Sequence, residues 1–137
     1  MSVPERGEVW LADLGYTAKV RPVLVVSTPY SERDYALVQV VPHTTQARNA
    51  QFGVRLPVPF LASGVFNVQG MLAVPAPKCL RRIGMLTPAQ MAHVEAIIKR
   101  WLGLTLFWSC LRPPLTGVAP PDNTRSDHAS GSNLLFD

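Results

Sequence analysis

Apolar residues occur in short runs over the first half of the chain. Runs rich in strand formers cover residues 8–13, 23–27 and 36–41, and weaker ones bounded by proline or glycine cover 52–56, 64–68 and 71–74. The run 23–27 is apolar on both faces, which is typical of a central, doubly covered strand that Pro22 opens. Many short strands with closely spaced turns predict a small barrel or a strongly curled antiparallel sheet.

One helix is clearly indicated near residue 90. Thr87 and Gln90 form a capping box, Pro88 occupies the first helical position and Gly103 supplies a left-handed stop. The apolar face of this helix consists of Met91, Val94, Ile97, Ile98, Trp101 and Leu102. We interpret this face, together with Trp10, as core packing against the sheet. The predicted fold class is therefore mainly β with a C-terminal helix (α+β).

The composition changes after Leu104. An apolar stretch at 105–111 is followed by prolines and then by a segment rich in Asp, Asn, Ser and Gly. Such a tail buries too little apolar surface to offset its ordering entropy. We predict a folded domain at 1–104 and a largely disordered extension at 105–137, in which Phe107 and Trp108 either cover a sheet edge or stay exposed.

Charge and cysteine content narrow the class of protein. The 137 residues carry a net charge of +4, and eleven of the thirteen basic residues precede residue 105. A positive field of this kind attracts polyanions without selecting a sequence. The two cysteines, with no CxxC and no His/Cys cluster, predict neither a metal site nor a disulfide framework. No signal peptide or membrane span is recognisable, so a cytoplasmic location with no membrane association is expected.

Two side chains at strand ends suggest chemistry on a phosphodiester. Arg21 precedes the second strand and Thr44 closes the third. A guanidinium is a fork of donors suited to phosphate, and a hydroxyl adds a neutral donor for another phosphate oxygen. Taken alone, each residue also has a plain structural interpretation, because surface arginines are common and threonine often forms turns.

The order of several motifs resembles the PemK/MazF toxin family over most of residues 6–104. The matching segments are Arg6-Gly7-Glu8-Val9-Trp10, the run Arg21 to Ser27, Val41-Pro42-His43-Thr44, the segment around Gln69, and the terminal helix that ends Trp101-Leu102-Gly103-Leu104. The resemblance implies a small SH3-like, partly open antiparallel barrel of the CcdB/MazF type. It also implies a homodimeric endoribonuclease of a toxin-antitoxin module, which cleaves single-stranded RNA and is held by a cognate antitoxin protein.

The resemblance also implies the site. By position, Arg21 and Thr44 are the catalytic pair, and no metal or cofactor is expected. The RNA's own 2′-hydroxyl would attack the phosphate, leaving a 2′,3′-cyclic phosphate and a 5′-hydroxyl. The residues expected to bind RNA are Lys19, His43, Thr45, Arg48 and Gln69.

Three questions stay open at the level of sequence. His43 is an alternative proton acceptor, because imidazole titrates near neutrality. Strand alternation, however, points His43 and Thr44 to opposite faces unless the strand has already ended. Relatives often carry an arginine and a threonine after the glutamine at position 69, where this chain has Gly70, Met71 and Leu72. This departure keeps an inactive RNA- or antitoxin-binding relative as one alternative, and the barrel shared with CcdB-like gyrase poisons keeps such a poison as another.

Overall fold

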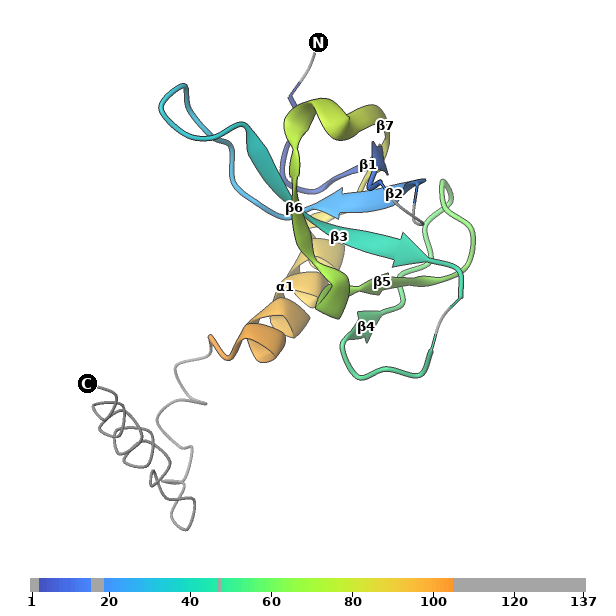
Figure 1. Ribbon diagram of the computed structural model, residues 1–137. Helices are drawn as coiled ribbons and strands as arrows, with labels where there is room; N and C mark the ends of the chain where they lie inside the picture. The colour runs from blue at the N-terminus through green and yellow to red at the C-terminus, as the bar shows by residue number, and fades with distance from the viewer. Residues whose placement is uncertain (1–2, 16–18, 47, 105–137) are drawn as a thin grey trace, which may run out of the picture. The chain divides into compact units, whose positions relative to one another are not determined.

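The computed structural model describes residues 3–15, 19–46 and 48–104. The chain forms β1 (Glu8–Asp13), β2 (Val20–Val25), β3 (Leu37–Thr44), β4 (Gly53–Val54), β5 (Val65–Asn67), β6 (Leu72–Pro75), β7 (Cys79–Met85) and α1 (Pro88–Leu102). Two 3₁₀ turns, η1 (Val68–Gly70) and η2 (Ala76–Lys78), flank β6. Figure 1 shows the strands gathered on one side of α1. The predicted mainly β architecture with a C-terminal helix is confirmed.

The strands form one antiparallel, open sheet in the order β4-β5-β3-β2-β1-β7, and β6 also pairs with β3. The long strand β3 pairs with β6 along its first half, at Leu37 to Val40, and with β5 at its end, where His43 faces Phe66 and Thr44 faces Val65. Its other edge pairs with β2. The ends of β2 and β3 therefore lie in the middle of the sheet rather than at an edge.

Alternation along the strands divides the core into two clusters, one on each face of the sheet. Val9, Leu24 and Val41 point to the face that α1 covers through Met91 and Val94. Trp10, Val23 and Val40 belong to the other cluster, which β6 and β7 close with Val74 and Cys79. Val23, Leu24 and Val25 are all buried, so the prediction of a doubly covered central strand is confirmed.

One strand boundary differs from the sequence prediction. The strand β2 begins at Val20, so Pro22 lies inside it rather than at its start. This is tolerated because β3 pairs with β2 only from Val23 onward, and proline is accepted where a strand is paired on one side. The strand β3 ends at Thr44, three residues after the apolar run 36–41, so the prediction that Thr44 closes the third strand is confirmed.

The strand β7 was missed by sequence reasoning. Its sequence, Cys79 to Met85, contains two arginines and a glycine, and most of its side chains are exposed because it pairs only with β1. An edge strand of this kind lacks the apolar alternation that marks a strand in sequence. Arg82 of β7 pairs with the buried carboxylate of Glu8 at 3.2 Å, which fixes β7 to β1.

The helix α1 follows its predicted signals closely. The Thr87 hydroxyl accepts from the Gln90 amide, the Gln90 side chain accepts from the Thr87 amide, and Gly103 adopts the left-handed conformation with φ 68°. The predicted core position of Trp101 is wrong, since this residue is 39% exposed and its ring contacts Phe52 at 5.0 Å between ring centroids. Leu102, also placed on the apolar face, is exposed.

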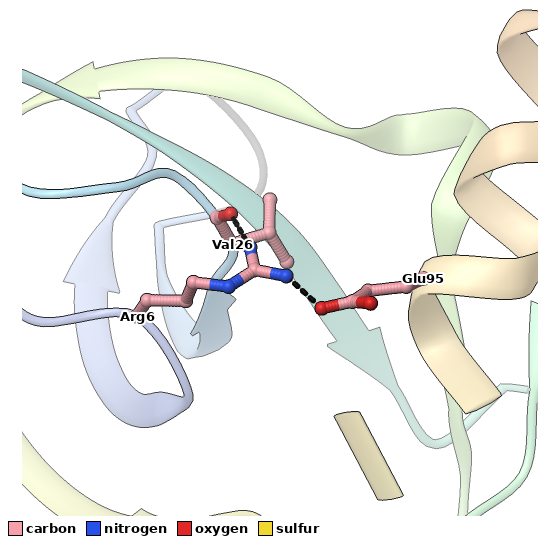
Figure 2. Close-up of polar contacts among 3 residues, drawn as sticks. All are labelled: Arg6, Val26 and Glu95. Atoms are coloured by element: carbon pink, nitrogen blue, oxygen red, sulfur yellow. Dashed lines mark hydrogen bonds and ion pairs between the residues drawn. The ribbon is translucent and has the colours of Figure 1, made fainter. Parts of the chain in front are cut away.

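An arginine clamp joins the start of the chain to the helix. Figure 2 shows the Arg6 guanidinium donating to the carbonyl oxygen of Val26 and to the carboxylate of Glu95 on α1. The two contacts tie the segment before β1, the residue just after β2 and the helix together. Arg6 therefore has a structural task that uses both terminal nitrogens of its guanidinium.

Some expectations fall outside the described part of the chain. The extension 105–137, including Phe107 and Trp108, is not among the described residues. No helix in the described ranges is long and apolar enough to cross a membrane.

Candidate functional site

Two adjoining hollows open where β2 begins and β3 ends. They share Arg21, Thr44 and Gln46. Arg21 lies in β2 and Thr44 is the last residue of β3, and these strands are neighbours in the sheet. The fold therefore brings the two predicted catalytic residues to one place, with a cavity on either side of them.

The larger hollow is polar and has a volume of about 420 Å³. Besides the shared residues, its lining includes Arg48, Asn67 and Gln69, with Ala50, Gly53 and Val65 completing the wall. Arg48 brings a second guanidinium, and the amides offer both donors and acceptors. This hollow can hold an anion and read the polar edge of an attached group.

The smaller hollow has a volume of about 310 Å³, and most of the residues that it does not share with the larger hollow are apolar. Besides the shared residues, its lining consists of Val20, Pro22, His43, Thr45, Leu61 and Ala62. Leu61 and Ala62 belong to the segment between β4 and β5. This segment forms one side of the hollow, and β2 forms another.

Burial lowers the pKa of His43, the histidine in the smaller hollow. His43 is only 4% exposed, and its ring meets the buried Phe66 ring edge-on with centroids 4.9 Å apart. Burial lowers the pKa of His43 below its usual value near 6.5, because the charged form loses water. The imidazole at this position is therefore neutral at physiological pH.

The end of β3 explains how His43 and Thr44 share a hollow. Alternation still separates them within the strand, since His43 packs on Phe66 in the helix-side core while Thr44 is half-buried. Thr44 ends the strand, and its hydroxyl accepts from the amide of Gln46 at 3.1 Å in a local turn. The hollow past this turn touches both residues, whereas only Thr44 also lines the larger one.

The other residues expected to bind RNA divide between the hollows, with one exception. Thr45 lines the smaller hollow, and Arg48 and Gln69 line the larger. Lys19 lines neither of them; it closes the β1–β2 turn, donating to the Gly15 carbonyl at 3.0 Å with a positive φ of 48°.

Sequence reasoning missed two polar residues of the larger hollow, Gln46 and Asn67. Gln46 was detectable as part of the polar run that follows β3. Asn67 was hidden inside a predicted strand, and it lines the hollow because β5 lies beside the end of β3, where Thr44 pairs with Val65.

In the described residues, no group of three or more His, Cys, Asp or Glu side chains is placed to hold a metal ion. The polar groups around Arg21 and Thr44 are instead guanidinium, hydroxyl and amide groups, which suit an anionic ligand.

Comparisons with known proteins identify similar sequences and structures. A family model described as PemK-like, MazF-like toxin of type II toxin-antitoxin system matches residues 5–102. The curated Endoribonuclease MazF1 of Mycobacterium bovis and Endoribonuclease MazF4 of Mycobacterium tuberculosis are each 32% identical over 104 residues, which is 76% of this chain and 97% of each relative.

Solved structures give the same picture. A mycobacterial endoribonuclease in complex with its cognate antitoxin superposes with a TM-score of 0.65 at 29% identity, covering 74% of this chain and 97% of that one. A MazE-MazF structure from Deinococcus radiodurans superposes with a TM-score of 0.64 at 26% identity, covering 77% of this chain and all of the matched chain. The expected fold type is thereby confirmed.

Proposed function

Since this chain belongs to the family of PemK-like, MazF-like toxins of type II toxin-antitoxin systems, we propose that it is an endoribonuclease toxin that cleaves single-stranded RNA at Arg21 and Thr44. The observation that carries the proposal is the meeting of these two side chains between two hollows. A scissile phosphate at this point has room for a nucleotide on each side.

The proposed reaction uses the RNA's own 2′-hydroxyl. Its oxygen attacks the adjacent phosphorus, the bond to the 5′-oxygen breaks, and the products are a 2′,3′-cyclic phosphate and a 5′-hydroxyl. Arg21 stabilises the extra negative charge of the transition state and hydrogen-bonds the departing oxygen, which takes its proton from water, while the Thr44 hydroxyl holds a non-bridging oxygen. Because no metal takes part in this route, EDTA leaves the rate unchanged.

His43 is the proton acceptor in this proposal. A guanidinium is a poor base because its pKa lies far above neutrality. The neutral imidazole lines the same hollow as Arg21 and Thr44 and takes the proton of the 2′-hydroxyl.

The proposed assembly is a cytoplasmic homodimer controlled by a cognate antitoxin. Several large apolar side chains remain exposed in the single copy: Leu37, Leu80, Met85, Trp101 and Leu102. Exposed apolar groups of this kind are suited to a protein partner. Two of the structural neighbours are described as complexes with an antitoxin or as MazE-MazF, which supports the same kind of partner here.

The test is incubation of the purified, antitoxin-free protein with a long mixed-sequence RNA in EDTA, followed by mapping of the cut ends. The expected result is a set of discrete cuts with 5′-hydroxyl ends, abolished by Arg21→Ala. Arg55→Ala is the matched control, because Arg55 is exposed and lines neither hollow. Intact RNA from folded wild-type protein would contradict the proposal and favour a gyrase poison or an inactive binder.

A further inference from the structure

The two hollows beside Arg21 and Thr44 differ in the residues that line only one of them, and this difference bears on how RNA sequence is selected. The larger hollow presents the amides of Asn67 and Gln69, and neither side chain makes a hydrogen bond to another described residue. The smaller hollow has no such amide of its own, and beside His43 and Thr45 one side of it is lined by Leu61 and Ala62. Amides discriminate bases by hydrogen bonds, whereas an apolar wall discriminates by size and stacking.

The apolar wall is held at both ends by close contacts to glycines. A Cβ atom on Gly64 would lie 2.2 Å from the Thr44 carbonyl oxygen and 2.9 Å from Cε1 of His43. A Cβ atom on Gly84 would lie 2.4 Å from the Phe60 ring, so this ring sits directly on β7. The segment between Phe60 and Gly64 is therefore fixed to β7 on one side and to the end of β3 on the other.

Leu61 and Ala62 lie between these two anchors, so their wall is formed before any ligand binds. A preformed wall costs little ordering entropy on binding, which favours selective recognition. The contact at Gly64 also reaches the two residues of β3 that line the hollow, His43 and Thr44. The segment 60–64 therefore fixes the position of Leu61 and Ala62 relative to His43 and Thr44.

We propose that the smaller hollow is the binding site for the nucleotide on the 5′ side of the cut, selected by the size of its base against Leu61 and Ala62, and that the larger hollow reads the nucleotide on the 3′ side through Gln69 and Asn67. The inference rests on the proposed function for its direction. The 2′-hydroxyl that attacks belongs to the nucleotide on the 5′ side, and its proton acceptor, His43, lies in the smaller hollow.

The first experiment compares cleavage sequences of three variants on a mixed RNA. Ala62→Leu fills the smaller hollow and should change the base preferred immediately 5′ of the cut by at least tenfold, leaving the 3′ preference as it is. Gln69→Ala removes an amide from the larger hollow and should relax the 3′ preference alone. Ala92→Leu is the matched control, because Ala92 is an exposed alanine on α1 that lines neither hollow.

The second experiment separates this inference from the proposed cleavage. A random pool of 2′-fluoro RNA octamers lacks the attacking hydroxyl and is selected for binding to the same proteins. Wild-type protein should enrich bases at two adjacent positions, and Ala62→Leu should flatten the one that lies 5′ of the position flattened by Gln69→Ala. If wild-type protein cuts no RNA but still shows this enrichment, the nuclease fails and the binding sites stand.

Three results would overturn the inference even with an active nuclease. The first is an unchanged cleavage sequence in folded Ala62→Leu protein. The second is an effect of both variants on the same side of the cut, and the third is the reversed order of sides. Loss of all base enrichment in the wild-type binding selection would overturn it as well.

Discussion

Two arginines, Arg6 before β1 and Arg21 in β2, show how one residue type can have occupied donors in one place and free donors beside a cavity in another. The Arg6 guanidinium donates hydrogen bonds to the Val26 carbonyl oxygen and to the Glu95 carboxylate (Figure 2). The Arg21 side chain makes no hydrogen bond or ion pair with any other residue that the structure describes, and it lines both hollows. An arginine whose donors are occupied stabilises the fold, while one whose donors face a cavity is available to a phosphate.

The largest effect, on the rate of RNA cleavage, is expected at Arg21. Arg21→Lys keeps the positive charge but loses the planar fork, so cleavage should fall by about 10²-fold while the melting temperature stays the same. Initial cleavage rates on a fixed RNA and a thermal melt of the same sample check this. Full activity in the lysine variant would mean that charge alone suffices.

A smaller loss is expected at Thr44. Thr44→Val removes one neutral donor to a phosphate oxygen, worth about tenfold in rate, whereas Thr44→Ser should keep most of the activity because it keeps the hydroxyl. The cleavage rates of the two variants, measured together, test whether the hydroxyl acts. Equal rates for valine and serine would remove Thr44 from the chemistry.

For Arg6 the loss should appear in stability instead. Arg6→Ala removes a charged hydrogen bond to a backbone carbonyl and a half-exposed ion pair, which together are worth about 1–2 kcal/mol of unfolding free energy. Glu95→Gln breaks only the ion pair and should cost about 0.5 kcal/mol. Urea unfolding of both variants gives these values, and an effect of Glu95→Gln as large as that of Arg6→Ala would assign the clamp to the ion pair alone.

The smallest predicted effect concerns pH. Burial lowers the pKa of His43 in the folded state, so the unfolded chain binds the extra proton first. His43 therefore contributes stability that is complete above the unfolded value of about 6.5 and is lost as the pH falls from there toward the lower folded pKa. Below about pH 6.5 the melting temperature of the wild type should fall with pH more steeply than that of His43→Phe. Thermal melts across this pH range check this, and equal slopes for the two proteins would contradict the burial effect.

Strands and helices with a clear apolar pattern or capping signal were predictable from sequence. The proximity of Arg21 to Thr44 was predictable as well. The first strand matches the predicted run 8–13, and α1 matches its capping box and glycine stop. Trp101 was misplaced because helical periodicity identifies a face but does not say how far the sheet extends beneath it.

The walls of the hollows were not predictable, because they depend on contacts between distant segments. Ala62 gives no signal in the sequence, and its place beside Arg21 follows from the packing of Gly64 on Thr44 and of Phe60 on Gly84. The strand β7, which holds Gly84, was itself missed. Tertiary packing of this kind cannot be inferred from local propensity.

Cleavage and melting, measured together for Arg21→Ala and Arg6→Ala, separate the roles of the two arginines. Arg21→Ala should melt like the wild type and lose cleavage by about 10³-fold, whereas Arg6→Ala should melt several degrees lower and still cleave RNA below its melting temperature. Robust cleavage by folded Arg21→Ala protein, or a lowered melting temperature in that variant matching that of Arg6→Ala, would contradict these roles.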